Sequence, residues 1–183
     1  MKALVIYESM YGNTNVVATA IASGLGACGE VKLGSVSETK PESVTDFDVL
    51  VIGGPTHMYG MSRSGTRKAA AEVAAADDDI DIEPGAEGPG LREWFGRLPD
   101  GKGKRGAAFD TRAEGPALVY GSAAKGIARR LRRNKYRPIT DPESFFIEDS
   151  EGPLKDGEVE RARRWGAELG EKFNALENGL ENG

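Results

Sequence analysis

The sequence predicts an α/β protein built around a parallel β-sheet with helices on both faces. Two short apolar runs, KALVIY at residues 2–7 and DVLVIGG at residues 48–54, have the composition of strands buried on both faces. Segments with apolar residues at three- and four-residue spacing follow these runs, a pattern typical of amphipathic helices. Strands that alternate with helices of this length imply right-handed βαβ units and therefore a parallel sheet.

The first half of the chain alternates strand and helix. After the first strand, residues 14–26 carry a four-residue apolar repeat that predicts a helix ending at Gly26. A short strand is expected near 30–36, and an alanine-rich helix over 64–76. Residues 77–90 are acidic and punctuated by Gly and Pro, so we expect a surface insertion there.

The second half continues the same alternation. Apolar residues at i, i+3, i+4 and i+7 predict a helix over 91–98, and KRGAAFD predicts a strand over 104–110. Ser122 is a suitable N-cap for a further amphipathic helix. A last short strand is expected at 145–148, followed by a helix that Asp156 can cap.

Length and composition are those of one globular domain. The chain has 183 residues, of which 39% are hydrophobic and 29% charged. We therefore expect a single domain over residues 1–175, with residues 176–183 as a frayed tail. The single cysteine, Cys28, excludes an internal disulfide and a cysteine-based metal cluster. We accordingly expect no metal site.

The chain lacks the sequence features of a membrane or secreted protein. No run approaches the roughly 20 apolar residues needed to span a bilayer, and the first strand begins without a signal-type cleavage site. These features predict a cytoplasmic protein without membrane insertion. The formal charge of −5 and the pI near 5.1 argue against general nucleic-acid affinity.

Charge is unevenly distributed along the sequence. Residues 77–87 hold an acidic cluster, and residues 129–137 hold a basic run of five arginines and one lysine. Each is either a solvated surface or a docking site for a redox partner.

The loop after the first strand has the residue types of a phosphate-binding loop. In residues 8–14, ESMYGNT, hydroxyls at Ser9 and Thr14 flank Gly12 and Asn13 at the start of a helix, where the helix dipole is positive. The loop has neither the lysine of a triphosphate site nor the glycine spacing of a pyrophosphate site. A monophosphate bound without a cationic side chain fits it best. The alternative is an ordinary turn capped by Thr14.

Two further loops follow strong strands and should lie at the same edge of the sheet, where ligands bind in open parallel sheets. Residues 54–60, GPTHMYG, offer apolar and aromatic side chains that can pack on a flat heterocycle. Residues 110–118, DTRAEGPAL, follow the strand at 104–110.

The first loop resembles that of the flavodoxin family, in which a segment of the form x-Ser/Thr-x-Thr-Gly-Asn-Thr holds the phosphate of FMN. Ser9, Gly12, Asn13 and Thr14 match this form, and Tyr11 replaces the common threonine. The resemblance covers nearly the whole chain, and the stretch over 144–166 looks like actinobacterial flavodoxin-domain proteins. It implies a flavodoxin-like three-layer sandwich, with a five-stranded parallel sheet in the order 2-1-3-4-5 and helices on both faces.

The resemblance also implies one non-covalent FMN and its contacts. The second and third loops correspond to the family's two flavin-ring loops. The expected cofactor-binding residues are Ser9, Met10, Tyr11, Gly12, Asn13, Thr14, Pro55, Thr56, His57, Met58, Tyr59, Gly60, Thr111, Arg112 and Ala113.

Two of these residues have alternative roles. His57, the only histidine, is expected to face solvent or form hydrogen bonds rather than to act as a catalytic acid or base. Arg112 stands where many flavodoxins place an aromatic residue. A cation near the ring would make the reduction potential less negative. The alternative role for Arg112 is a salt bridge to Glu114 or Asp110.

Three functions are compatible with the sequence. The leading hypothesis is an FMN-binding electron-transfer protein that shuttles electrons between a reductase and an acceptor enzyme, with no catalytic residue of its own. The alternative is an FMN-dependent oxidoreductase, such as a quinone reductase or a protoporphyrinogen-type oxidase. The third is an interaction module without cofactor, which the intact loop disfavours.

Overall fold

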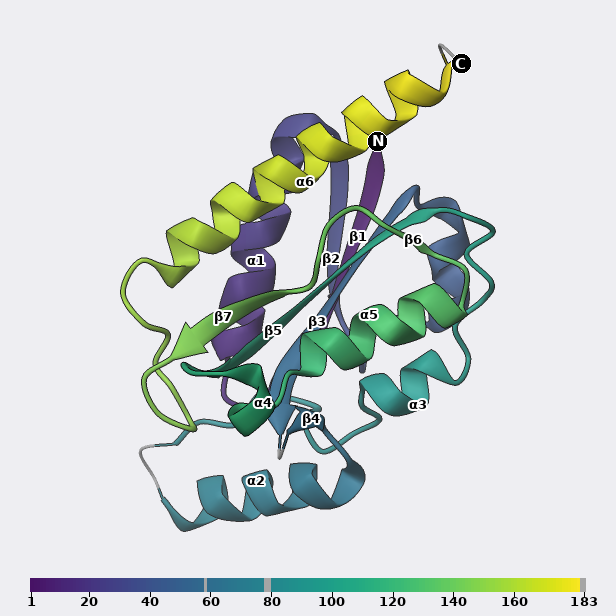
Figure 1. Ribbon diagram of the computed structural model, residues 1–183. Helices are drawn as coiled ribbons and strands as arrows, with labels where there is room; N and C mark the ends of the chain where they lie inside the picture. Colours follow the sequence, from purple (N-terminus) through teal and green to yellow (C-terminus); the bar gives the residue numbers. More distant parts are fainter. Residues whose placement is uncertain (58, 78–79, 182–183) are drawn as a thin grey trace.

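A parallel β-sheet forms the middle layer of the structure, a computed structural model that describes residues 1–57, 59–77 and 80–181 (Figure 1). Its neighbouring strands are β2 (Glu30–Ser35), β1 (Lys2–Tyr7), β3 (Val49–His57) and β5 (Arg105–Ala113), in that order. All three pairs are parallel. This order confirms the expected flavodoxin-like α/β fold.

The sheet has seven strands rather than the five expected. The far edge is split, because β6 (Arg137–Pro138) pairs with the start of β5 and β7 (Glu143–Ile147) pairs with its end. Pro138 and Pro142 lie at this interruption, and a proline has no N–H to donate to a neighbouring strand. The seventh strand, β4 (Gly60–Met61), folds back antiparallel on the end of β3.

Helices cover both faces of the sheet (Figure 1). On one face lie α1 (Asn13–Leu25) and α6 (Glu158–Glu181), and on the other lie α3 (Leu91–Phe95) and α5 (Ala123–Arg133). The helix α6 continues to Glu181 and so includes most of the segment expected to be frayed.

Alternation along β1 divides the core in two. Leu4 and Ile6 pack into the cluster with α3 and α5, whereas Ala3 and Val5 pack into the cluster with α1 and α6. All four side chains are fully buried. The uninterrupted apolar run of this strand is thus explained, since a strand covered on both faces needs apolar residues at every position.

The helices α1 and α6 approach closely through glycine. A Cβ atom added at Gly166 would collide with the backbone carbonyl of Ile21, and one at Gly24 would collide with that of Arg163. This contact holds the final helix against the helix that follows the first loop.

The remaining elements lie in the connections. The helix α2 (Ser64–Ala76) lies below the carboxyl edge of the sheet in Figure 1. A short α4 (Ala117–Tyr120) precedes α5, and 3-10 turns occupy Gly26–Cys28 and Pro41–Asp46. None of the helices in the described part of the chain combines the length and the apolar character required to cross a membrane.

Candidate functional site

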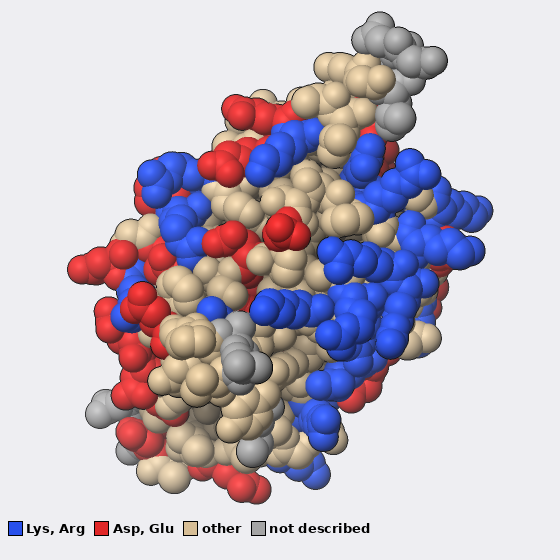
Figure 2. Space-filling model, viewed as in Figure 1, with Lys and Arg blue, Asp and Glu red and all other residues tan. Residues whose placement is uncertain are grey.

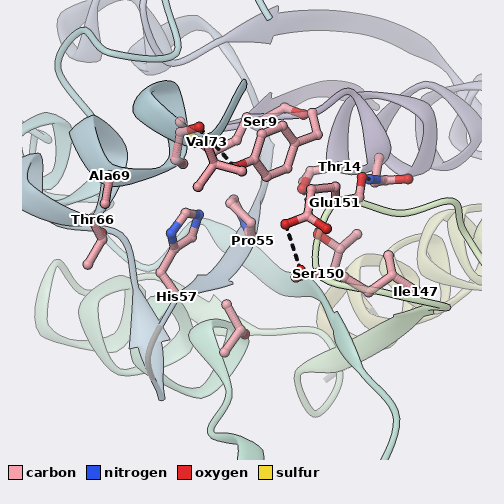
Figure 3. Close-up of a pocket in the computed structure, with 16 residues that line it drawn as sticks. Ser9, Thr14, Pro55, His57, Thr66, Ala69, Val73, Ile147, Ser150 and Glu151 are labelled. Atoms are coloured by element: carbon pink, nitrogen blue, oxygen red, sulfur yellow. Dashed lines mark hydrogen bonds between the residues drawn. The ribbon is translucent and has the colours of Figure 1, made fainter. Parts of the chain in front are cut away.

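A pocket of about 290 Å³ opens at the carboxyl edge of the sheet (Figure 3). The loop after β1, the end of β3, the end of β5, the loop after β7 and the helix α2 each contribute to its walls. It is lined by Ser9, Met10, Tyr11, Asn13, Thr14, Pro55, Thr56, His57, Thr66, Ala69, Ala70, Val73, Thr111, Ile147, Ser150 and Glu151. The three loops predicted from sequence therefore meet at one place.

The loop over residues 9–15 presents a series of free backbone donors. Gly12 adopts φ 85°, in the left-handed region that favours glycine, and this turn leads directly into α1. Within the described residues, no acceptor receives a hydrogen bond from any backbone N–H between Ser9 and Asn15. The N-terminus of α1 adds the partial positive charge of its dipole.

Hydroxyl groups complete this arrangement. The Oγ of Ser9 is buried and has no hydrogen-bond partner among the described residues. A buried hydroxyl without a partner costs about 1–3 kcal/mol, so its retention in the pocket wall is best explained by a ligand that accepts from it. Thr14 Oγ1 is buried as well and lies 2.7 Å from Thr111 Oγ1, which joins the first loop to the end of β5.

Hydrogen bonds join this loop to the segments around it. The side chain of Asn13 donates to the carbonyl of Glu151 at 2.7 Å, and the hydroxyl of Tyr11 donates to the carbonyl of Ala70 at 3.1 Å. The backbone N–H of Glu83 donates to the carbonyl of Met10 at 2.7 Å. These bonds engage side chains and carbonyls, and they leave the amide hydrogens of the loop available.

A buried carboxylate ties β3 and β5 to the start of α5. Oδ2 of Asp110 accepts from Thr56 Oγ1 at 3.0 Å, from Ser122 Oγ at 2.8 Å and from the backbone of Ala124 at 2.9 Å. Thr56 Oγ1 accepts in turn from the backbone of Ala123 at 2.9 Å. Asp110 is fully buried, and it fixes Thr56 in the pocket wall.

His57 lies in the pocket wall as a neutral group. Burial lowers the pKa of its imidazole below the ordinary 6.5, and the charge of Arg67 lowers it further, although Glu8 acts in the opposite direction. Figure 3 shows the ring beside Pro55. Both Glu8 and Arg67 are themselves buried, with exposed fractions of 3%.

The rest of the pocket wall is largely apolar. Ala69, Ala70 and Val73 of α2 form one side, with Pro55 and Ile147 contributed by the strand ends. The lining set includes no Lys or Arg. In the described part of the chain, no group of three or more His, Cys, Asp or Glu side chains is arranged to hold a metal ion. The site is suited to an apolar body that carries one anionic group.

Some residues expected at the site lie elsewhere. Tyr59 and Gly60 line a neighbouring groove, and the side chain of Tyr59 is 71% exposed. Met58 lies outside the described residues. Ala113 is the last residue of β5 and does not line the pocket.

Arg112 is buried at the end of β5 and directed towards β7. Its Nε donates to Ser144 Oγ at 3.1 Å, and its Nη1 donates to the carbonyls of Ala113 and Gly115 at 3.0 and 2.8 Å. Its guanidinium lies 5.1 Å from the ring centroid of Phe146. Neither expected salt bridge is formed, and the residue does not line the pocket.

Several lining residues were not identified from sequence. Thr66 and Val73 belong to a helix with no motif, and Ser150 and Glu151 follow the last strand, far from the other loops. Only their topological position at the carboxyl edge could have indicated them.

The fold and the pocket define a class of protein. It is a doubly wound α/β protein whose first strand-to-helix loop presents unbonded amides and hydroxyls at the edge where the strand order reverses. The flavodoxin family model matches residues 5–92, which contain the first loop, the end of β3 and α2. Over this part of the chain the sequence is similar to flavodoxins.

Solved structures agree on the fold. A flavodoxin from the domain Archaea superposes with a TM-score of 0.63 at 22% identity, covering 95% of this chain and 99% of that one. Flavodoxin 1 from Bacillus cereus superposes with a TM-score of 0.62 at 19% identity, covering 92% of this chain and 97% of that one. The flavodiiron protein from Giardia intestinalis gives 0.60 at 20% identity, with 95% of this chain matched to 36% of that one. None of the curated proteins matches this sequence.

FMN is the cofactor that the similarity to flavodoxins implies. The pocket fits it on two structural grounds. The partnerless hydroxyl of Ser9 and the free amides over residues 9–15 suit a phosphate dianion, and the apolar side formed by α2 suits a flat ring.

Proposed function

We propose that this protein is an electron carrier that holds one FMN at the carboxyl edge of its sheet and shuttles electrons between a reductase and an acceptor enzyme. When bound, FMN supplies the reversible uptake of electrons, and the protein supplies binding, orientation and electrostatics. The observation that carries the proposal is the buried, partnerless Oγ of Ser9 beside free backbone donors.

The phosphate would be held by the first loop. A phosphate monoester has a charge of about −1.5 to −2 at pH 7, and charge-assisted hydrogen bonds from N–H and O–H groups are about twice as strong as neutral ones. Ser9 and Thr14 contribute hydroxyls, and Gly12 allows the turn that exposes the amides. A lysine is therefore not needed to bind the anion.

The ring would be held by the remaining walls. Pro55, Thr56 and His57 come from the end of β3, and Ala69 and Val73 come from α2. Tyr11 is joined to α2 by the hydrogen bond from its hydroxyl to the carbonyl of Ala70. His57 is neutral at pH 7 because burial lowers its pKa, so it places no charge beside the ring. Of the candidates expected from sequence, Tyr59 and Gly60 remain as proposed contacts at the rim, next to the neighbouring groove.

The test begins with cofactor content. The purified protein should be yellow and should release FMN on denaturation, and Ser9→Ala should retain less FMN than the matched control Ser43→Ala, whose exposed hydroxyl lies in a remote 3-10 turn. A colourless protein that fails to bind saturating FMN while folded would contradict the proposal.

The role as a carrier has its own measurement. Reduction of the bound FMN by NAD(P)H should require an added flavin reductase, after which electrons should pass to an acceptor protein. Steady turnover of NAD(P)H with a quinone by the isolated protein would instead establish an oxidoreductase.

A further inference from the structure

A groove lined by positive charge runs beside the FMN pocket. It has a volume of about 610 Å³ and lies between β4 and α5. We call it the basic groove and define it by five cations, Arg92, Lys125, Arg129, Arg130 and Arg133. Figure 2 shows basic side chains gathered over α5 and towards β6, whereas acidic side chains gather on the opposite edge of the view.

The charge of the basic groove is not neutralised within the protein. None of its five cations forms an ion pair with a residue in the ranges that the structure describes. Every charged residue of α5 is basic. Arg92 is held in place by the carbonyls of Met61 and Ser62, which accept from its Nε at 3.2 and 2.8 Å. Neutral carbonyls position the guanidinium without cancelling its charge.

The cations of the groove repel one another. Burial lowers the pKa of Arg130, and the charges of Arg92, Arg133 and Arg129 lower it further. This repulsion is a cost in the free protein, and a negatively charged partner would relieve it.

The basic groove lies close to the FMN pocket. A smaller cavity of about 230 Å³ shares Tyr59 and Arg92 with the groove, and it shares His57 and Thr66 with the pocket. Exposed apolar residues lie in this region. Tyr59, which lines both cavities, is 71% accessible and pairs with Gly121 of the groove, and Val119 and Tyr120 directly precede Gly121 and are 58% and 47% accessible. An apolar, aromatic centre with charged residues around it is the usual anatomy of a protein interface.

We propose that the basic groove, with Tyr59, Val119 and Tyr120, docks an acidic redox protein so that its electron-carrying group lies near the bound FMN. This inference rests on the proposed carrier function and adds the class of partner. A protein is favoured over a nucleic acid because the positive charge is local while the chain as a whole has a charge of −5, which would repel an extended polyanion. The opposed acidic edge would also orient the approaching partner.

The test uses the FMN-loaded protein and a pre-reduced acidic [2Fe–2S] ferredoxin as probe. Each reduced cluster gives one electron to the FMN, and stopped-flow absorbance records the second-order rate constant. For the wild type, the rate constant should fall as ionic strength rises. In Arg129→Glu/Arg133→Glu it should fall at least about tenfold at low ionic strength, as expected for the loss of electrostatic steering.

The control variant reverses two exposed cations on another face. Arg164→Glu/Lys172→Glu on α6 changes the net charge by the same amount and should retain a rate constant within about twofold of the wild type. Equal losses in the two variants, or a wild-type rate constant independent of salt, would overturn the inference. So would a duplex oligonucleotide that binds the holoprotein more tightly than the ferredoxin does.

Two further readouts separate this inference from the proposed function. FMN content and the rate of oxidation of the reduced protein by a small neutral quinone should be unchanged in both variants. If they are unchanged while the charge reversals have no effect on the ferredoxin reaction, only the docking inference fails. If the wild type binds no FMN, the carrier function and the docking inference both fail.

Discussion

Thr14 Oγ1 lies 2.7 Å from Thr111 Oγ1, and this buried contact joins the loop after β1 to the end of β5. The two residues are far apart in sequence, yet both line the pocket. A hydroxyl pair shared between two segments of the pocket wall holds these segments at a defined separation.

The loss of one member of this pair should be more damaging than the loss of both. Thr14→Val leaves the Thr111 hydroxyl buried without its partner, which costs about 1–3 kcal/mol, whereas removing both hydroxyls avoids that penalty. Urea unfolding of the two single variants and of Thr14→Val/Thr111→Val should therefore give a favourable coupling energy. If the change in the free energy of unfolding of the double variant equals the sum of the changes in the two single variants, the contact contributes nothing to stability.

Removal of the Asp110 carboxylate should disconnect three elements at once. Asp110→Ala leaves Thr56 Oγ1, Ser122 Oγ and the backbone N–H of Ala124 without their shared acceptor. We expect the free energy of unfolding to fall by at least about 2 kcal/mol, because hydrogen bonds to a charged group contribute about 1.5–3 kcal/mol each. Asp141→Ala, at an exposed carboxylate, is the control and should change stability by less than about 0.5 kcal/mol.

The contact between α1 and α6 should not tolerate a methyl group. Gly166→Ala would place a Cβ against the carbonyl of Ile21, so the helices must separate and we expect a loss of about 1–3 kcal/mol. Gly179, in the same helix, has nothing within 4 Å of such a Cβ. Gly179→Ala should accordingly stabilise by up to about 1 kcal/mol. A similar effect of the two substitutions on thermal unfolding would refute the close approach.

The protonation of His57 should weaken the folded state as the pH falls. Burial and the charge of Arg67 lower the pKa of His57 in the folded protein. Near and below pH 6.5 the imidazole is therefore protonated to a greater extent in the unfolded chain than in the folded one, and the free energy of unfolding decreases as the pH falls. Below pH 6.5 the free energy of unfolding of the wild type should therefore decrease more steeply with falling pH than that of His57→Gln. Because this is the only histidine, its titration can be followed by NMR without assignment, and a folded pKa at or above 6.5 would contradict the burial effect.

Local patterns in the sequence identify the strands and helices that make the frame. In β1 and β3 an uninterrupted apolar run predicts that every residue is buried. In α1 and α5 the spacing of the apolar residues predicts which face of the helix is buried. The division of the edge strand into β6 and β7 could not be predicted from the sequence. It depends on how prolines 138 and 142 meet the edge of β5, which is a tertiary relationship.

The site was accessible to sequence reasoning only in part. The first loop carries a recognisable pattern, and the ends of β3 and β5 follow from topology. Arg112 shows the limit of such reasoning, because the direction of a long side chain depends on acceptors such as Ser144 Oγ on a neighbouring strand. Glu151 and Val73 carry no motif, and only the fold shows that they line the pocket.

A comparison of FMN with riboflavin tests the central claim most directly, since the two differ only in the phosphate. Titration of the apo-protein, followed by quenching of flavin fluorescence, should show FMN binding at least about 100-fold more tightly, because two charge-assisted hydrogen bonds at about 1.5–3 kcal/mol each are at stake. Ser9→Ala should lower the affinity for FMN and leave the affinity for riboflavin unchanged, so that the ratio of the two affinities decreases. Equal affinity for the two ligands in the wild type would contradict the account.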